Sequence, residues 1–108
     1  MSFSRACGVA DLDDGKPYAA VVDGTEIALV RQGEEVFAIR DECSHASIAL
    51  SEGDVEGCSI ECWLHGSRFD LRTGAALGLP ATQPVAVFPV RVEADDVLVD
   101  PTAPLTTP

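Results

Sequence analysis

Two cysteine–histidine pairs constrain this chain more than any other feature. Cys43 and His45 form a C-x-H pair, Cys62 and His65 form a C-x-x-H pair, and sixteen residues (46–61) lie between the pairs. The protein has two histidines, and both belong to this pattern. Two loops that each offer a thiolate and an imidazole can enclose a single metal centre from two sides. The pattern therefore predicts a metal site with these four side chains as ligands.

Two kinds of metal site use two cysteines and two histidines. One is a tetrahedral zinc, whose ligands usually follow the order C-x(2–4)-C and then H-x(3–5)-H. The other is a [2Fe–2S] cluster in which two cysteines bind one iron and two histidines bind the other. Here the order is Cys, His, Cys, His. This order favours the cluster, because each loop supplies one ligand to each iron, and a structural zinc module that binds a partner is the alternative.

Short runs rich in Val, Ile and Phe alternate with turn-forming residues along most of the chain. This spacing is typical of an all-β domain built from short strands. Asp23-Gly24 suits a tight two-residue hairpin turn, since both positions tolerate a positive φ. The predicted strands are residues 18–22, 25–31, 36–40, 88–93 and 97–100.

The chain length predicts one domain. Its 108 residues leave no room for a second one, and 46% hydrophobic residues suffice for an ordinary core. We expect the domain to span residues 1–100. Residues 101–108 contain three prolines and little to bury, so we expect a disordered tail.

The charge balance excludes some classes of partner. Seven Lys and Arg oppose eighteen Asp and Glu, for a net charge of −11. Such a surface is unsuited to nucleic acid or to an anionic membrane, and it favours a partner with a basic patch. The longest apolar runs, such as residues 27–30, are far below the ~18 residues of a spanning helix, and the first ten residues lack a secretory pattern. We therefore expect a cytoplasmic protein, in which Cys7 and Cys58 are plain thiols and not a disulfide.

The segment Glu61-Cys62-Trp63-Leu64-His65-Gly66-Ser67-Arg68-Phe69-Asp70, together with Cys43-Ser44-His45, resembles the Rieske-type ferredoxins. The resemblance extends to residues 36–39, 50–53 and 79–82 and thus covers nearly the whole chain. It implies three small antiparallel sheets, with an inserted cluster-binding subdomain of two loops at about residues 41–79. It also implies that Cys43, His45, Cys62 and His65 bind one [2Fe–2S] cluster per chain.

Four residues around the cluster have expected roles, which for Ser67 and Pro80 come from the resemblance and for Trp63 and Gly66 come from the residue type. The hydroxyl of Ser67 matches a donor to a cluster sulfur, and Trp63 covers the cluster or packs beside it. Gly66 serves a backbone turn, as we also expect of Gly74. Pro80 fixes a loop next to the cluster.

We expect a low reduction potential, because the chain lacks residues that raise the potential in other Rieske proteins. High-potential Rieske proteins have two further cysteines that clamp the loops, and here Ile48 and Leu64 occupy those positions. Phe69 replaces a tyrosine whose hydroxyl raises the potential in those members. Six acidic residues between positions 41 and 61 add negative charge nearby. We predict a potential of about −150 mV, at the low end of the Rieske range.

These features predict a one-electron carrier. It would pass electrons from an NAD(P)H-dependent flavin reductase to a terminal non-haem iron oxygenase. It would not itself be an enzyme, because such an oxygenase needs a mononuclear iron with its own histidines, and both histidines here are already used. The chain is also similar to actinobacterial Rieske proteins associated with iron–sulfur cluster assembly, so an electron donor in that process is a second hypothesis.

Overall fold

The computed structural model describes residues 3–42, 48–63, 66–77, 83–102 and 104. This part of the chain is nearly all β, with two single-turn 3-10 helices, and measures 39 × 26 × 19 Å. None of its helices is long and apolar enough to cross a bilayer. The elements are β1 (Ser4–Gly8), η1 (Val9–Asp11), β2 (Pro17–Val22), β3 (Thr25–Gln32), β4 (Glu35–Arg40), η2 (Leu50–Glu52), β5 (Asp54–Glu56), β6 (Ser59–Glu61), β7 (Arg68–Asp70), β8 (Val87–Phe88), β9 (Val90–Glu93) and β10 (Asp96–Val99).

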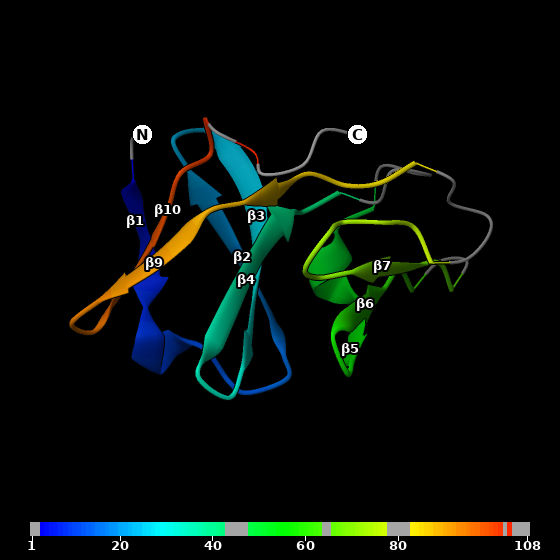
Figure 1. Ribbon diagram of the computed structural model, residues 1–108, viewed down its shortest axis with the longest axis horizontal. Coiled ribbons are helices and arrows are strands. Elements are labelled where there is room, and N and C mark those ends of the chain that lie inside the picture. Colours follow the sequence, from blue (N-terminus) through cyan, green and yellow to red (C-terminus); the bar gives the residue numbers. More distant parts are fainter. Residues whose placement is uncertain (1–2, 43–47, 64–65, 78–82, 103, 105–108) are drawn as a thin grey trace.

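The strands form three antiparallel sheets, which confirms the all-β prediction with small sheets. A terminal sheet has the order β1-β10-β9, a central sheet has the order β2-β3-β4-β8, and a third sheet has the order β5-β6-β7. Figure 1 shows the central sheet between the other two. The chain leaves the central sheet after β4, builds the third sheet, and returns through β8.

The central sheet is buried on both faces. Ile27, Ala28, Leu29 and Val30 of β3 are all fully buried. Because successive side chains of a strand point to opposite faces, this run divides between two cores. Ala28 and Val30 belong to one core, and Ile27 and Leu29 belong to the other. The uninterrupted apolar run of residues 27–30 is therefore the mark of a strand that lies in the middle of a three-layer structure.

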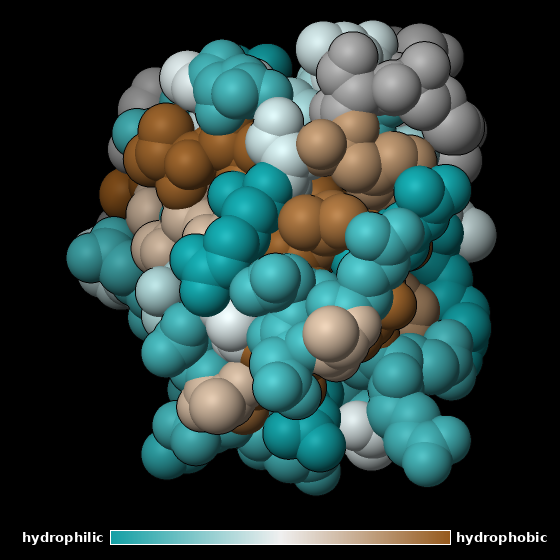
Figure 2. Space-filling view, turned by 90° about the vertical axis from the view of Figure 1, so that its left-hand side faces the viewer, coloured by the Kyte–Doolittle hydropathy of each residue, from teal (hydrophilic) through white to brown (hydrophobic). Residues whose placement is uncertain are grey.

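The core on the terminal side, here called the terminal core, joins the central sheet to β1 and β10. Val97 and Val99 of β10 pack there with Cys7 of β1. Burial raises the pKa of the Cys7 thiol, since it disfavours the thiolate. Seen from this end of the molecule, the surface is mostly hydrophilic with small separate hydrophobic patches (Figure 2). The terminal sheet thus closes one side of the molecule.

The core on the opposite face, here called the site core, holds the third sheet. Ile60 of β6 and Phe69 of β7 face it as a cross-strand pair, with Leu50 of η2 and Leu71 beside them. Strands of three residues cannot form a stable sheet alone. The third sheet therefore depends on apolar contact with the central sheet.

Two contacts also fasten the third sheet to the β3–β4 hairpin. Arg72 makes a two-pronged ion pair with Glu35, with N–O distances of 3.0 and 3.1 Å, and its guanidinium lies over the ring of Phe37. Its hydrogen bonds hold the pKa of Glu35 below the usual value. The side-chain amide of Gln32 donates to the carbonyl of Gly57. These contacts limit rotation of the third sheet about the apolar interface.

The predicted strands agree with the structure except at one place. Asp23 and Gly24 both have positive φ, as the predicted hairpin turn requires. The predicted strand at residues 88–93 is divided at Pro89 between β8 of the central sheet and β9 of the terminal sheet, and β9 forms an antiparallel hairpin with β10. Proline has no N–H for a ladder, so the chain changes sheets there. The strands β1, β5, β6 and β7 were not among those predicted.

The predicted tail begins beside a buried carboxylate. Asp100 is fully buried, and its Oδ1 accepts hydrogen bonds from the N–H and the hydroxyl of Thr102 at 2.9 and 2.6 Å. Residues 103 and 105–108 of the tail lie outside the described part.

Gly74, which follows β7, packs closely against the segment that leads into β8 of the central sheet. Its carbonyl accepts from the N–H of Val85 at 2.8 Å, and its φ is +76°. A Cβ at this position would overlap the carbonyl oxygen of Val85. Gly15 has nearly the same φ, +75°, but a Cβ there would meet no atom within 4 Å.

We predict that Gly74→Ala destabilises the protein more than Gly15→Ala. Both substitutions carry the cost of a left-handed backbone, about 1–2 kcal/mol. Gly74→Ala adds a steric overlap worth roughly 1–3 kcal/mol. Urea unfolding of the two variants measures the difference, and equal losses would contradict the close approach of residues 74 and 85.

Candidate metal centre

The second predicted ligand loop begins where β6 ends. Cys62 is buried, with 1% of its surface exposed. Its N–H donates to the carbonyl of Ser67 at 2.7 Å, and its own carbonyl accepts from the N–H of Gly66 at 2.9 Å. Gly66 has a φ of +74°, which lets the chain turn back within four residues. The loop is therefore tightly closed at its base, with the Cys62 thiol held at the edge of the site core.

Three further predicted residues lie around this loop. Ser67 is buried, and Phe69 is fully buried in the site core as the cross-strand partner of Ile60. Trp63 is half-exposed at 53%, so its ring lies at the surface next to Cys62. The other predicted ligands, Cys43, His45 and His65, and the predicted neighbour Pro80 lie outside the described residues.

The first predicted ligand loop is anchored at both of its described ends. Before it, Asp41 is buried and accepts hydrogen bonds from the N–H and the hydroxyl of Ser51 at 2.7 and 2.6 Å. The N–H of Asp41 also donates to the carbonyl of Glu26 at 3.0 Å. After it, Ile48 packs against the site core and Leu50 is part of it. The chain on either side of residues 43–47 thus meets the same core that holds Cys62.

Gly53 follows the first predicted loop and lies against β6, the strand that leads into the second predicted loop. A Cβ at Gly53 would overlap the carbonyl oxygen of Glu61, the residue before Cys62. Only glycine permits so close an approach of two backbones. The roots of both predicted loops therefore lie together, as a shared centre with two thiolates and two imidazoles requires.

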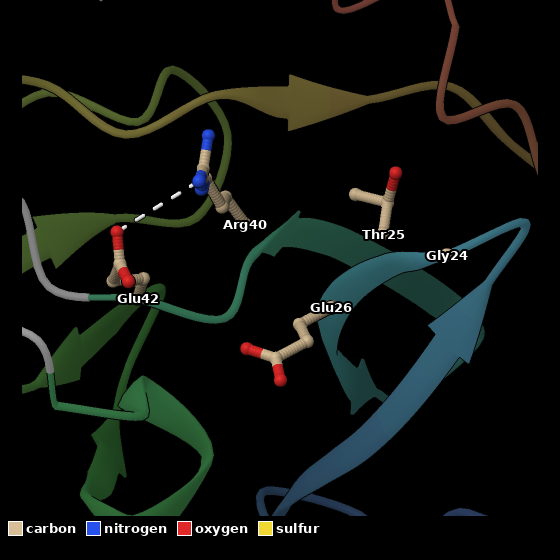
Figure 3. A pocket seen from close by; sticks show the side chains of 5 residues that line it. All are labelled: Gly24, Thr25, Glu26, Arg40 and Glu42. Atoms are coloured by element: carbon tan, nitrogen blue, oxygen red, sulfur yellow. Dashed lines mark ion pairs between the residues drawn. The ribbon is translucent and has the colours of Figure 1, made fainter.

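A hollow of about 290 Å³ adjoins the root of the first loop (Figure 3). Gly24, Thr25 and Glu26 line one side of it, and Arg40 and Glu42 line the other. Arg40 Nη2 lies 3.8 Å from Glu42 Oε1, and both side chains are exposed. Exposed pairs of this kind hold their geometry weakly, so the hollow is not a built ligand site.

The two arginines of the third sheet region make ion pairs within the chain. Arg68 pairs with Glu61 and Glu56, and Arg72 pairs with Glu35. The partners come from other strands, and no local signal identifies them.

Cys7 and Cys58 are free thiols that lie on opposite faces of the central sheet. Cys7 is in the terminal core, and Cys58 packs against the site core. A layer of β-sheet separates them, so they cannot approach within the span of a disulfide.

The described residues form an all-β domain of three small sheets, in which backbone hydrogen bonds among Cys62, Gly66 and Ser67 close the base of the second predicted loop. A family model of the Rieske [2Fe–2S] domain matches residues 2–89. The chain belongs to the Rieske [2Fe–2S] family. Its cofactor is therefore a Rieske cluster, and the zinc alternative is set aside.

Relatives matched over nearly their whole length are ferredoxins. The chain is 45% identical over 102 residues to a 3-phenylpropionate/cinnamic acid dioxygenase ferredoxin subunit of Escherichia coli K12, covering 93% of this chain and 94% of that protein. It is 42% identical over 107 residues to the biphenyl 2,3-dioxygenase ferredoxin component of Rhodococcus jostii, covering 99% and 100%. The chain is thus an electron-transfer component and not itself the catalyst.

Solved structures agree with this assignment. The ferredoxin of carbazole 1,9a-dioxygenase from Nocardioides aromaticivorans has a TM-score of 0.90 and 40% identity, covering 94% of this chain and 100% of that one. A ferredoxin in complex with its oxygenase, from another carbazole 1,9a-dioxygenase structure, has a TM-score of 0.82 and 34% identity, covering 90% and 91%.

We predict that Asp41→Ala weakens the anchor of the first loop. Two charge-assisted hydrogen bonds to Ser51 are lost, which lowers stability by about 2–3 kcal/mol. Urea unfolding of the holo-protein, together with the decay of its visible absorption, measures the effect.

Asp54→Ala is the matched control, since Asp54 is an exposed carboxylate of β5. Ser51→Ala combined with Asp41→Ala completes a double-mutant cycle, in which we expect clear coupling between the two sites. If Asp41→Ala costs no more than Asp54→Ala, the anchor is not a significant restraint on the loop.

Proposed function

We propose that this protein is a low-potential Rieske ferredoxin whose cluster is bound by Cys43, His45, Cys62 and His65. The two cysteines hold one iron and the two histidines hold the other. The buried position of Cys62, at the edge of the core that also anchors both ends of the first loop, is the observation that carries this assignment. When bound, such a cluster supplies one-electron redox chemistry.

The residues of the chain have separate tasks in this function. The hydrogen bonds between Cys62, Gly66 and Ser67 fix the second loop, and Asp41 and Ser51 fix the first. The Ser67 hydroxyl is proposed to donate to a cluster sulfur. Leu50 and Phe69 pack in the site core with Cys62, and we propose that they exclude water from the inner side of the centre.

We further propose that the electron passes from an NAD(P)H-dependent flavin reductase to a terminal non-haem iron oxygenase that acts on an aromatic substrate. Dioxygenase ferredoxin relatives matched over 93% and 99% of this chain support the oxygenase as acceptor. A solved complex named for a reduced oxygenase and an oxidised ferredoxin supports direct contact between such partners. We place this exchange in the cytoplasm, where Cys7 and Cys58 stay reduced.

Electron delivery is tested with the purified, reduced holo-protein. It is mixed anaerobically with a purified, oxidised ring-hydroxylating oxygenase, and reoxidation is followed by stopped-flow absorbance. We expect rapid transfer of one electron per ferredoxin. Rapid transfer to an apo-protein scaffold of cluster assembly, with none to the oxygenase, would favour the assembly hypothesis instead.

We predict that Phe69→Tyr raises the reduction potential above the value of about −150 mV expected for the unmodified protein. The new hydroxyl would donate to the cluster region and stabilise the reduced, more negative state. A mediator-poised titration of both proteins measures the shift. Phe88→Tyr, at a buried position in the terminal core, is the control and should leave the potential unchanged. No shift in Phe69→Tyr would contradict the explanation of the low potential.

A further inference from the structure

The loop that carries Cys62 is flanked by an ion pair between Glu61 and Arg68. Glu61 and Arg68 are the last cross-strand pair of β6 and β7 before the loop. Their neighbours Ile60 and Phe69 face the site core, so the alternation of the strands puts Glu61 and Arg68 on the opposite face. Arg68 Nη2 lies 2.7 Å from Glu61 Oε2. The ion pair therefore ties together the two strands that the loop connects.

The guanidinium of Arg68 spans the whole third sheet. Its Nη2 lies 3.4 Å from Glu56 Oε2 of β5, and its Nη1 donates to the Ser59 hydroxyl of β6 at 3.3 Å. The side chains of Arg68 and Glu61 are only 34% and 31% exposed, whereas that of Glu56 is 80% exposed. Arg68 and Glu61 are thus partly shielded from solvent, and their charges act over a longer range than those of a surface pair.

Positive charge is scarce near this loop. Residues 41–79 contain seven acidic residues and two arginines. Arg72 points to the β3–β4 hairpin, where Glu35 neutralises it. Arg68 is the only cationic residue in the three strands of the third sheet, all of which are described. It is also one residue from Ser67, whose carbonyl closes the Cys62 loop.

We propose that Arg68 and Glu61 are positioning residues that set the reduction potential in opposite directions. This inference rests on the proposed role of Cys62 as a cluster ligand. One-electron reduction adds one negative charge to the centre, which the Arg68 guanidinium stabilises and the Glu61 carboxylate opposes. Glu61 and Glu56 offset most of the effect of Arg68, so the potential stays low despite an arginine beside the loop.

The signs distinguish this role from a purely structural one. If the pair only braced the loop, removal of either partner would loosen the same strands and change the centre in the same way. If the charges act on the potential, Arg68→Gln lowers it and Glu61→Gln raises it. The double variant, which removes both charges, returns near the original value.

The experiment is an anaerobic redox titration of the holo-protein, poised with dithionite and mediators and followed by electron paramagnetic resonance. We expect each single substitution to change the equilibrium constant for reduction by roughly threefold to tenfold, where tenfold corresponds to about 59 mV for a one-electron couple. Arg68→Lys keeps the charge and should stay near the original potential. Glu56→Gln should raise the reduction potential by a smaller amount. It tests the direction of the charge effect if the Glu61 or Arg68 variant fails to assemble its cluster.

The matched control is the ion pair of Arg91 and Glu93 in the terminal sheet, with an N–O distance of 3.5 Å. Arg91→Gln and Glu93→Gln change the net charge equally but lie across the central sheet, so we expect little effect. If the reduction potential shifts in the same direction for Arg68→Gln and Glu61→Gln, or shifts no more than in the controls, the inference about this ion pair is wrong. The proposed function would not be affected by that result. Absence of a Rieske signal from the unmodified protein would overturn the proposed function as well.

Discussion

The double-sided burial of the central sheet is the constraint on which the rest of the structure depends. Antiparallel sheets commonly bury one face and expose the other. Here the apolar run of residues 27–30 supplies side chains to both faces, so a core forms on each side. The terminal sheet covers one core and the third sheet covers the other (Figure 1). A polar side chain at any of these four positions would leave one outer sheet without support.

This arrangement explains how so small a domain holds the short strands around Cys62 in place. The strands of the third sheet are three residues long and gain their stability from the site core. Cys62 lies at the edge of that core, and its loop is closed by short hydrogen bonds. Asp41 is bonded to Ser51, and Gly53 lies against Glu61, the residue before Cys62. Rigid support of this kind would keep the reorganisation of the proposed ligands on electron transfer small, as an electron carrier requires.

Local patterns predicted the parts of the fold that local physics determines. The Asp23-Gly24 turn located the first hairpin, and the cysteine–histidine spacing predicted the kind of cofactor that the family match shows. The change of sheet at Pro89 could have been read from the missing N–H of proline. The division of residues 27–30 between two cores was also present in the sequence, because an unbroken apolar run within a predicted strand indicates burial of both faces.

Interactions between distant residues could not be predicted in the same way. The bond from Ser51 to Asp41, the close approach of Gly53 to Glu61 and the ion pair of Arg72 with Glu35 each depend on the tertiary fold. Their residue types are common in loops and carry no signal of their partner. The cysteine–histidine motif could therefore be recognised from the sequence. The hydrogen bonds, ion pair and close backbone contact around it could not.

The central claim is that two cysteines and two histidines from two loops bind one [2Fe–2S] cluster. The most direct measurement is electron paramagnetic resonance of the dithionite-reduced holo-protein, combined with detection of nitrogen couplings and with iron and sulfide analysis. The account predicts two irons and two sulfides per chain and an unpaired electron coupled to two imidazole nitrogens. A reduced cluster without nitrogen coupling, or a protein that holds zinc and no sulfide, would contradict it.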